Sequence, residues 1–520
     1  MRTRRIFLSA LAEIIPYIIL GIIGFIKVRI IIDYLGSDLH GYFQFINQLI
    51  SYLFLIEAGF GAAVIYKLYK PFADKNKAGI EAVFNGARKI FRYIGLAILG
   101  LILIAIFGIP FVFNIGTAHL WDVMLSFTII SVAYLICYFG KRNAYYAMFC
   151  AAQKKYVYSI VFNVLKILCD IFIIISAIFI PHLLGIAIVI MIVKIIEEIA
   201  IRIYGRKHFP FLGQTKEVDT SAFAMTKDLV WHQVGFMVSN NSAIIVLMFF
   251  MNPFVVSIYA TYNFIARFLN EFTTRINNIV SYSFGNMFAK EEKDKRGYLI
   301  YDEYFILSVF MAMIIALTFV LSIRPFVGIW IGNVDYYISY LAVMLFGFNL
   351  FIWTIYSPLV AVINANGLFK ESKHVVFITA FINVSLSIFF VSQVQHLGVN
   401  AAIVGVLLAT ALANLVNLIL RIRVVKKYVF EKASSLMTLF EYGSYAVMFV
   451  GLCIGFKFIE TKLFGLNDHL ITIIASIGLL FIVICIFTFI VLLITKGNTK
   501  ELIKRVMMLL KKRSQKQEAA

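Results

Sequence analysis

Five polar residues recur at every fourth position of one apolar segment near the middle of the chain. They are Tyr259, Asn263, Arg267, Glu271 and Arg275. This spacing places all five on one slowly drifting face of a helix, where Glu271 can pair with either arginine. Because one carboxylate cannot neutralise two arginines, the pattern favours a positively charged stripe that lines a cavity. The alternative is an internal ladder of ion pairs that holds this helix to its neighbours.

An excess of positive charge inside apolar segments favours an anionic substrate. Ionisable groups at membrane depth are costly and mark a cavity or a partner, and Arg29 adds a cation in the first apolar segment. Arginine binds phosphate through two parallel hydrogen bonds, while nearby Asn and Tyr side chains can hydrogen-bond sugar hydroxyls. The predicted substrate-binding residues are Arg29, Arg267, Arg275, Asn47, Tyr259 and Asn263.

Other charged residues within the apolar segments have two interpretations. Lys166 and Asp170 are one helical turn apart, so they form either a neutralised structural pair or an element of ion-coupled transport. The same two interpretations apply to Glu57 and Glu271, and the sequence does not choose between them. Lys27 and Arg29 could both extend to the outer headgroups. A group near the inner surface is expected to be solvated: Lys194, Glu197 and Glu198.

The composition is that of an integral membrane protein. Hydrophobic residues make up 62% of the 520 and charged residues only 14%, whereas a soluble domain is nearer half apolar and a quarter charged. About fourteen apolar segments have the roughly 20 residues that a transmembrane helix requires. The five cysteines show no paired spacing, so neither a disulfide framework nor a metal site is indicated. No nucleotide-binding loop occurs, and no cofactor is expected.

The charges that flank the apolar segments predict the topology. Gaps rich in Lys and Arg alternate with gaps nearly free of them, and 38 of the 47 basic residues lie at the termini or in the even-numbered gaps. The positive-inside rule therefore places both termini in the cytoplasm, which an even number of spans also requires. Anionic headgroups on that face account for the net charge of +20, and no nucleic acid is needed to explain it.

The longest internal polar stretch divides the chain into two halves of six spans and a final pair. The predicted parts are an N-terminal six-helix lobe (1–204), a cytoplasmic linker (205–228), a C-terminal six-helix lobe (229–425), helices 13 and 14 (426–495) and a basic cytoplasmic tail (496–520). Two short echoes favour duplication, since residues 41–47 resemble 257–263 and residues 151–154 resemble 364–367. Halves with six spans each share one orientation, so the axis that relates them would run along the membrane normal.

Six short motifs occur along the chain. They are Arg29 followed by Asp33-Tyr-Leu-Gly36 and Gly41, Glu57-x-Gly59, Leu68-Tyr-Lys-Pro71, Gln153-Lys-Lys-Tyr156, Ser283-Phe-Gly-Asn286 and Asn366-Gly367. In order and position they resemble the polysaccharide transporter (Wzx-type) flippases of the multidrug/oligosaccharidyl-lipid/polysaccharide exporter superfamily. Length, span number and internal termini extend the resemblance over the whole chain. It implies two six-helix lobes around a central cavity and alternating access. It also implies transfer of undecaprenyl-diphosphate-linked oligosaccharide from the inner to the outer leaflet.

The resemblance also implies roles for particular residues. Arginines on the first and eighth helices, here Arg29 and Arg267, would meet the diphosphate, with Arg275 as a further candidate. The expected function is transport and not an enzymatic reaction. We expect a flippase in the bacterial cytoplasmic membrane that serves capsule, exopolysaccharide or teichoic-type polymer export, with membrane lipids, a polysaccharide polymerase and assembly proteins as partners.

Two other functions stay open. A cation-coupled multidrug exporter would have the same fold, although cationic drugs favour acidic cavities and the excess charge here is basic. A membrane polymerase or ligase would join the lipid-linked sugars, but such enzymes generally present a long external loop with polar catalytic residues. The external gaps of this chain are short, and the longest, about 457–469, contains no evident catalytic group.

Overall fold

Helices account for all regular structure in the part of the chain that is described. The computed structural model describes residues 2–57, 60–113, 115–221, 234–235, 237–238, 241–288, 295–430, 435–463 and 470–495. No strand occurs within these ranges, so the all-α fold class is confirmed. The predicted basic tail, 496–520, lies outside the described residues, as does part of the predicted linker.

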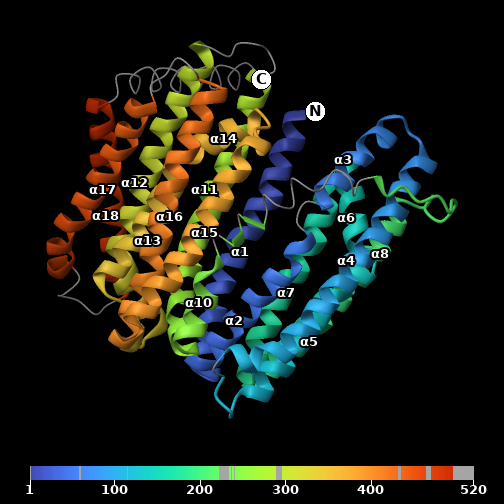
Figure 1. Ribbon diagram of the computed structural model, residues 1–520, viewed down its shortest axis with the longest axis horizontal. Coiled ribbons are helices and arrows are strands. Elements are labelled where there is room, and N and C mark those ends of the chain that lie inside the picture. The colour runs from blue at the N-terminus through green and yellow to red at the C-terminus, as the bar shows by residue number, and fades with distance from the viewer. Residues whose placement is uncertain are drawn as a thin grey trace. The chain divides into compact units, whose positions relative to one another are not determined.

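Tertiary contacts divide the chain into two compact units, Met1–Thr261 and Tyr262–Ala520. Unit 1 contains α1 (Arg2–Leu35), α2 (Ser37–Leu53), η1 (Phe54–Glu57), α3 (Phe60–Ala73), α4 (Lys77–Val112), α5 (Leu120–Phe139), α6 (Arg142–Ala151), α7 (Lys155–Phe179), α8 (Leu183–His208), α10 (Ala243–Phe250) and the first turns of α11 (Pro253–Phe288) (Figure 1). The division falls inside α11 because α10 packs against α2 and the Pro253 carbonyl lies directly against Gly41. The predicted lobe boundaries, which stand at the linker, stay a prediction.

Unit 2 continues α11 and is built around aromatic side chains. It contains α12 (Lys295–Ile331), η3 (Val334–Tyr336), α13 (Tyr340–Ile355), α14 (Ser357–Ala365), α15 (Phe369–Val394), η4 (Gln395–Leu397), α16 (Val399–Tyr428), α17 (Ser435–Leu463) and α18 (Leu470–Thr495). Phe351 stacks on Phe449 with ring centroids 4.8 Å apart. The buried hydroxyl of Tyr262 donates to the carbonyl of Tyr336 at 3.0 Å. These contacts tie α13 to α17 and α11 to η3.

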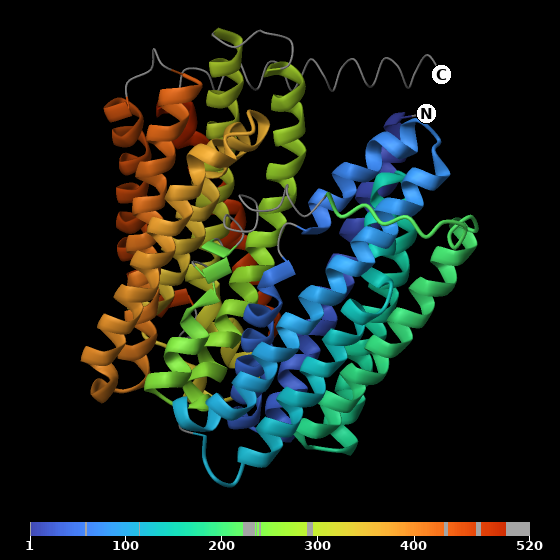
Figure 2. The ribbon, with the colours of Figure 1, turned by 45° about the vertical axis from the view of Figure 1, so that its right-hand side comes forward.

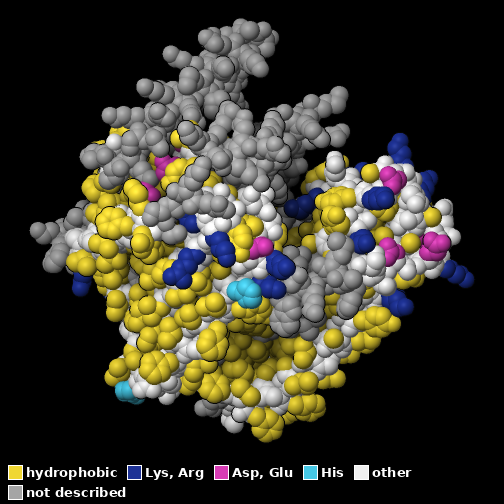
Figure 3. All heavy atoms as spheres, turned by 45° about the horizontal axis from the view of Figure 1, so that its top comes forward, with side chains coloured by type: hydrophobic (Ala, Val, Ile, Leu, Met, Phe, Trp, Pro, Cys, Tyr) yellow, Lys and Arg dark blue, Asp and Glu magenta, His cyan; other side chains and the backbone are white. Residues whose placement is uncertain are grey.

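Within the described ranges, eight helical segments are long and apolar enough to cross a membrane, by length and composition. They are α4, α5, α7, α12, the pair α13–α14, α15, α16 and α17. Many of their side chains are apolar and exposed; Phe107 and Phe111 on α4 are 72% and 90% exposed. Figure 3 shows many hydrophobic side chains at the surface in view. The prediction of a multi-pass membrane protein is confirmed.

The apolar segment 42–66, which is long enough in sequence for one transmembrane helix, is not one continuous helix. α2 ends at Leu53, a 3-10 turn runs from Phe54 to Glu57, and α3 begins at Phe60. The Phe54 ring lies 5.2 Å from that of Tyr138 on α5, so packing against a neighbouring helix accompanies the break. Most side chains of this segment suit a continuous helix, but Gly59 and Gly61 next to the break lower its helix propensity.

The same turn ends a short helix in each unit. α6 is followed by Gln153 with a φ of 56°, and α14 by Gly367 with a φ of 66°. In both turns the N–H of this residue bonds the carbonyl three residues back, and the next N–H bonds the carbonyl five residues before it. The turn therefore repeats at an offset of 214 residues. The alignment of Gln153 with Asn366 in the sequence echo is one residue out of register.

The segment that follows α8, residues 209–221, is strapped to α4 (Figure 2). The carboxylate of Glu81 is 2% exposed and accepts hydrogen bonds from the backbone N–H groups of residues 213–215. One turn later, the Asn85 amide donates to the carbonyls of Thr215 and Glu217, at 3.3 and 3.2 Å. A β-carbon at Gly86 would collide with the backbone carbonyl of Asp219, so glycine allows this close approach. We call residues 209–221 the linker strap.

Candidate functional site

An ion pair joins α1 to α7 inside unit 1. The Nζ atom of Lys27 lies 2.5 Å from Oδ1 of Asp170, and Asp170 is 8% exposed. The two residues are 143 positions apart in the sequence, and the helices that carry them pack against each other. The expectation that Lys27 extends to the outer headgroups is therefore wrong, because the buried carboxylate requires a counter-charge.

Asp170 was predicted to pair with Lys166 on the same helix, but its ion pair is with Lys27 on α1. Lys166 lies on α7 close enough to interact electrostatically with Asp170, Lys27 and Lys194, but the ion pair of Asp170 is made with Lys27. A lysine that precedes its acid by four residues is the less favourable order on a helix. Lys166 therefore adds positive charge near the Lys27–Asp170 pair but is not the ion-pair partner of Asp170.

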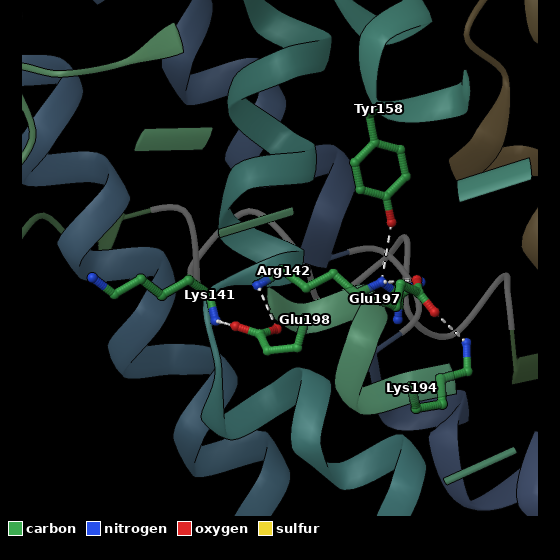
Figure 4. A network of polar contacts seen from close by, with 6 residues as sticks. All are labelled: Lys141, Arg142, Tyr158, Lys194, Glu197 and Glu198. Atoms are coloured by element: carbon green, nitrogen blue, oxygen red, sulfur yellow. Dashed lines mark hydrogen bonds and ion pairs between the residues drawn. The ribbon is translucent and has the colours of Figure 1, made fainter. Parts of the chain in front are cut away.

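Glu197 on α8 is the centre of a second charged group, which Figure 4 shows. Its carboxylate oxygens lie 2.7 Å from Nε of Arg142 and 2.7 Å from Nζ of Lys194. Arg142 also donates to the Tyr158 hydroxyl at 3.1 Å, and the Lys194 ammonium lies 4.9 Å from the centroid of the Tyr134 ring. The side chain of Glu197 is only 3% exposed. The expectation that it is solvated is wrong, since two cations neutralise it in the interior.

The adjacent acid, Glu198, binds backbone groups, whereas Glu197 pairs with charged side chains. The Glu198 carboxylate accepts hydrogen bonds from the backbone N–H groups of Lys141 and Arg142, at 2.7 and 3.1 Å. These groups lie at the start of α6, where a negative charge stabilises a helix. Gly140 leaves room for the carboxylate, because a β-carbon there would collide with it. Glu198 thus positions the first turn of α6, and with it the side chain of Arg142.

A cavity of about 370 Å³ lies beside this network, between α6 and the start of α7. Its lining residues are Arg142, Asn143, Tyr146, Lys155, Tyr158, Ser159, Phe162 and Asn163. Ser159 and Asn163 share a face of α7 with Lys166 and Asp170, since helical residues three or four apart lie one above the other. A polar track therefore leads from the cavity towards the Lys27–Asp170 pair.

This part of unit 1 has more cations than acids. Its basic residues are Lys27, Arg142, Lys155, Lys166 and Lys194, and its acidic residues are Asp170, Glu197 and Glu198. Amides, hydroxyls and aromatic rings line the cavity together with Arg142 and Lys155. Such a lining can bind a negatively charged group and hydrogen-bond a polar one beside it. Among the described residues, no group of three or more His, Cys, Asp or Glu could hold a metal ion.

The predicted binding residues of unit 1 lie on α1, α2 and η1. Arg29 is exposed on α1 and forms an ion pair with Asp33, with 3.1 Å between Nε and Oδ2. Asn47 on α2 is half-buried and donates its amide to the carbonyl of Phe43 at 2.9 Å. The side chain of Glu57, the last residue of η1, lies outside the described residues.

The predicted polar stripe lies along a single helix, α11. Tyr259 belongs to unit 1 and is 7% exposed. The other four residues belong to unit 2, where Arg267 and Glu271 are exposed and Asn263 and Arg275 are half-buried. The joint site that these residues would form with those of α1 and α2 stays a prediction.

Unit 2 contains buried polar residues that the sequence analysis did not single out. Arg421 on α16 is 6% exposed; its Nε donates to Oδ1 of Asn417 at 2.6 Å, and its guanidinium lies 5.7 Å from the ring of Tyr356. The amide of Asn414 donates to that of Asn349 on α13 at 3.0 Å. The spacing of three and four residues along an otherwise apolar helix was the available signal. Arg421 was instead counted among the basic residues of a cytoplasmic gap.

Lys27 and Arg142 were likewise missed as members of the charged group. The first was interpreted as a residue that reaches the headgroups, and the second as one of many basic residues in a cytoplasmic gap. Each has its acid on another helix, at Asp170 and Glu197. Sequence spacing indicates partners only within one helix, so it could not reveal these pairs.

The fold matches solved structures of membrane transporters at low sequence identity. The lipid II flippase MurJ, in an inward closed conformation, matches with a TM-score of 0.65 and 15% identity, covering 96% of this chain and 100% of its own. An inward-facing multidrug resistance MATE family transporter of the MOP superfamily matches with a TM-score of 0.64 and 12% identity, covering 80% and 96%. This chain has the MATE- and MurJ-type transporter fold.

Other likenesses agree with the MATE- and MurJ-type fold. The MATE transporter VcmN of Vibrio cholerae matches with a TM-score of 0.53 and 14% identity, covering 82% of this chain and 97% of its own. No protein-family model matches the chain, and no curated protein matches it in sequence. The likeness therefore lies in the arrangement of helices.

Proposed function

We propose that the protein is a flippase for lipid-linked oligosaccharide. It would move undecaprenyl-diphosphate-linked units from the inner to the outer leaflet of the bacterial cytoplasmic membrane, for export of a cell-surface polysaccharide. The observation that carries the proposal is the surplus of cations over acids in the helices of unit 1. A diphosphate needs fixed cations in a medium of low dielectric constant. The likeness to a lipid II flippase over 96% of the chain supports the same conclusion.

In the proposed cycle, the diphosphate and the sugars bind to different groups. Arg29, Arg267 and Arg275 bind the diphosphate, while Asn47, Tyr259 and Asn263 hydrogen-bond sugar or phosphate oxygens. The two lobes then rock between inward-open and outward-open states and expose the headgroup outside. The acids Glu57, Asp170 and Glu271 and the base Lys166 serve either ion coupling or structure. An ion gradient, the membrane potential or consumption of the product drives transport.

A multidrug exporter is the second candidate, because MATE transporters have the same fold. Two observations favour the flippase. The charged group of unit 1 is basic in excess, which disfavours a cationic drug. The match to MurJ also extends over more of this chain than the match to the MATE transporter, 96% against 80%. A polymerase or ligase is a third candidate, and only a measurement of lipid-linked sugars separates it from the flippase.

The experiment that tests the function is identification of lipid-linked sugars, leaflet by leaflet, in cells that lack the protein. The flippase proposal expects one undecaprenyl-diphosphate oligosaccharide to accumulate on the inner leaflet. Its accumulation on the outer leaflet would indicate a polymerase or ligase. Unchanged lipid-linked sugars together with altered drug sensitivity would indicate the exporter.

The arginine site is tested in the same cells by complementation. Arg267→Ala should lose most polymer export, whereas Arg267→Lys should retain part of it, because lysine keeps the charge and loses the two-point geometry. Arg423→Ala is a matched control, since Arg423 is also an exposed arginine on a long helix of unit 2. Full export by Arg267→Ala would refute the assignment of this residue.

A further inference from the structure

A cluster of five cations lies where α4, α8 and the turn between α5 and α6 meet in unit 1. Its members are Arg88 and Arg92 on α4, Lys141 at the turn, and Arg202 and Arg206 on α8; we call them the corner cluster. Arg88 interacts electrostatically with Arg92 and Arg202, and Lys141 with Arg88, Arg202 and Arg206. α5 packs against both α4 and α8, so the cluster spans one continuous bundle.

Glu198 is a carboxylate in the electrostatic surroundings of both Arg88 and Lys141. Both of its oxygens accept backbone N–H groups at the start of α6. One carboxylate cannot neutralise five cations. Burial and the neighbouring arginines lower the pKa of the Lys141 amine, which shows the cost of placing like charges together. A bound anion would remove that cost.

Arg88 is the inner member of the corner cluster. It is half-buried, and within the described part of the chain its Nε atom is buried and has no hydrogen-bond partner. A guanidinium N–H that lacks a partner away from water costs free energy. The other two arginines that share its surroundings, Arg92 and Arg202, are exposed. The corner therefore combines one half-buried arginine with several exposed cations that a single anionic group could contact.

The surface next to the corner cluster is apolar. Tyr93 and Leu96 on α4 are 62% and 54% exposed, and Ile199 and Ile203 on α8 are 53% and 61% exposed. Tyr93 and Leu96 follow Arg92 along α4, and Ile199 and Ile203 flank Arg202 on α8. A phosphate held by the cluster would therefore have acyl chains, and not water, beside it. This arrangement fits a phospholipid better than a soluble phosphate compound.

We propose that the corner cluster binds the phosphate headgroup of an anionic phospholipid, such as phosphatidylglycerol, from the leaflet on that side of the membrane. The bound lipid neutralises the cluster and fixes α4 against α8. This site is distinct from the arginines of the proposed transport cycle and does not depend on what the protein transports.

The test uses the full-length protein purified in mild detergent and supplied with phosphatidylglycerol or, separately, phosphatidylcholine. Native mass spectrometry would measure the lipid retained by wild type, by the double variant Arg88→Gln/Arg202→Gln, and by the control Lys89→Gln/Lys207→Gln. The control removes two charges from the neighbouring positions on the same two helices, and both lysines are exposed. Inorganic phosphate is added in a further arm to distinguish a lipid site from a phosphate site.

We expect wild type to retain phosphatidylglycerol over phosphatidylcholine. The double variant should bind it roughly 25-fold more weakly, since each basic residue near a membrane surface contributes about a fivefold factor. The control should resemble wild type, and inorganic phosphate should not displace the lipid. Thermal unfolding of each variant without added lipid would verify that it is folded, and a single variant, Arg202→Gln, replaces the double variant if that fails to fold.

Three outcomes would overturn the proposal. Equal retention of phosphatidylglycerol by wild type and by the test variant would show that the cluster does not bind it. An equal loss in the control would show that only overall charge matters. Displacement of the lipid by inorganic phosphate at millimolar concentration would indicate a site for soluble phosphate.

Discussion

The ammonium of Lys27 and the carboxylate of Asp170 form an ion pair at 2.5 Å that joins α1 to α7. Removal of one partner from a buried pair leaves an uncompensated charge, whereas replacement of both by apolar residues is often tolerated. We expect Lys27→Met and Asp170→Leu each to destabilise unit 1 by roughly 3 kcal/mol, and the double variant to recover most of that loss. Thermal unfolding in detergent would measure both.

Export by the same variants of Lys27 and Asp170 distinguishes a structural role of the ion pair from a role in transport. If the ion pair serves structure alone, the double variant should recover polymer export together with stability. Recovered stability without export would assign the pair to the transport cycle. Additive losses in the double variant would contradict the ion pair itself, because partners in contact must show coupling.

Loss of the Glu197 charge should destabilise unit 1. Glu197 neutralises Arg142 and Lys194 at 2.7 Å each, so Glu197→Gln leaves two cations facing each other with a neutral amide between them. We expect a loss of roughly 3 kcal/mol, read as a lower unfolding temperature. Asp122→Asn is the comparison: Asp122 is half-buried in the first turn of α5. A loss no larger than that of Asp122→Asn would contradict the role of Glu197.

Glu81 should hold the linker strap on α4. Its carboxylate accepts three backbone N–H groups from residues 213–215, and hydrogen bonds to a charged group contribute about 1.5–3 kcal/mol each. We expect Glu81→Ala to release the strap, so that limited proteolysis cuts within residues 209–221 at least about tenfold faster, as the open form becomes more populated. Mass spectrometry of the fragments would locate the cuts.

Glu217→Gln is the control for the strap. Glu217 lies in the strap itself and is exposed, and only its backbone groups appear in the contacts with α4. Cleavage of this variant should match wild type. Protection of the strap in Glu81→Ala would show that Asn85 and the backbone contact between Ala82 and Asp219 suffice to hold it.

Gly205 should not accept a larger residue. A β-carbon at this position would collide with the ring of Tyr145, which is 1% exposed and has little room to move. We expect Gly205→Ala to cost about 1–3 kcal/mol through overpacking, measured as a lower unfolding temperature. Gly100→Ala on α4 meets nothing within 4 Å, so it should stabilise the helix by about 1 kcal/mol. The opposite order of the two variants would contradict the packing of α6 on α8.

The sequence by itself determined the class of the protein and the placement of most helices. Long apolar segments cannot remain in water, and their backbone groups must be bonded internally in a membrane, so helices follow from composition. The period of four residues likewise placed the stripe from Tyr259 to Arg275 on one helix, because that geometry is local. One sequence echo marked the matching turns at Gln153 and Gly367, but it was displaced by one residue, since these turns are defined by backbone conformation and not by residue identity.

Only the tertiary structure decided which charges neutralise which. Lys27 forms an ion pair with Asp170, and Arg142 with Glu197, and each pair joins helices that are far apart in the sequence. Sequence spacing does not predict such pairs. The position of a residue on its helix shows which face its side chain is on, but not which other helix packs against that face. The tertiary fold also decided that Glu81 lies under the linker strap. A buried carboxylate is stable only where donors converge on it, and here those donors are backbone groups that composition does not reveal.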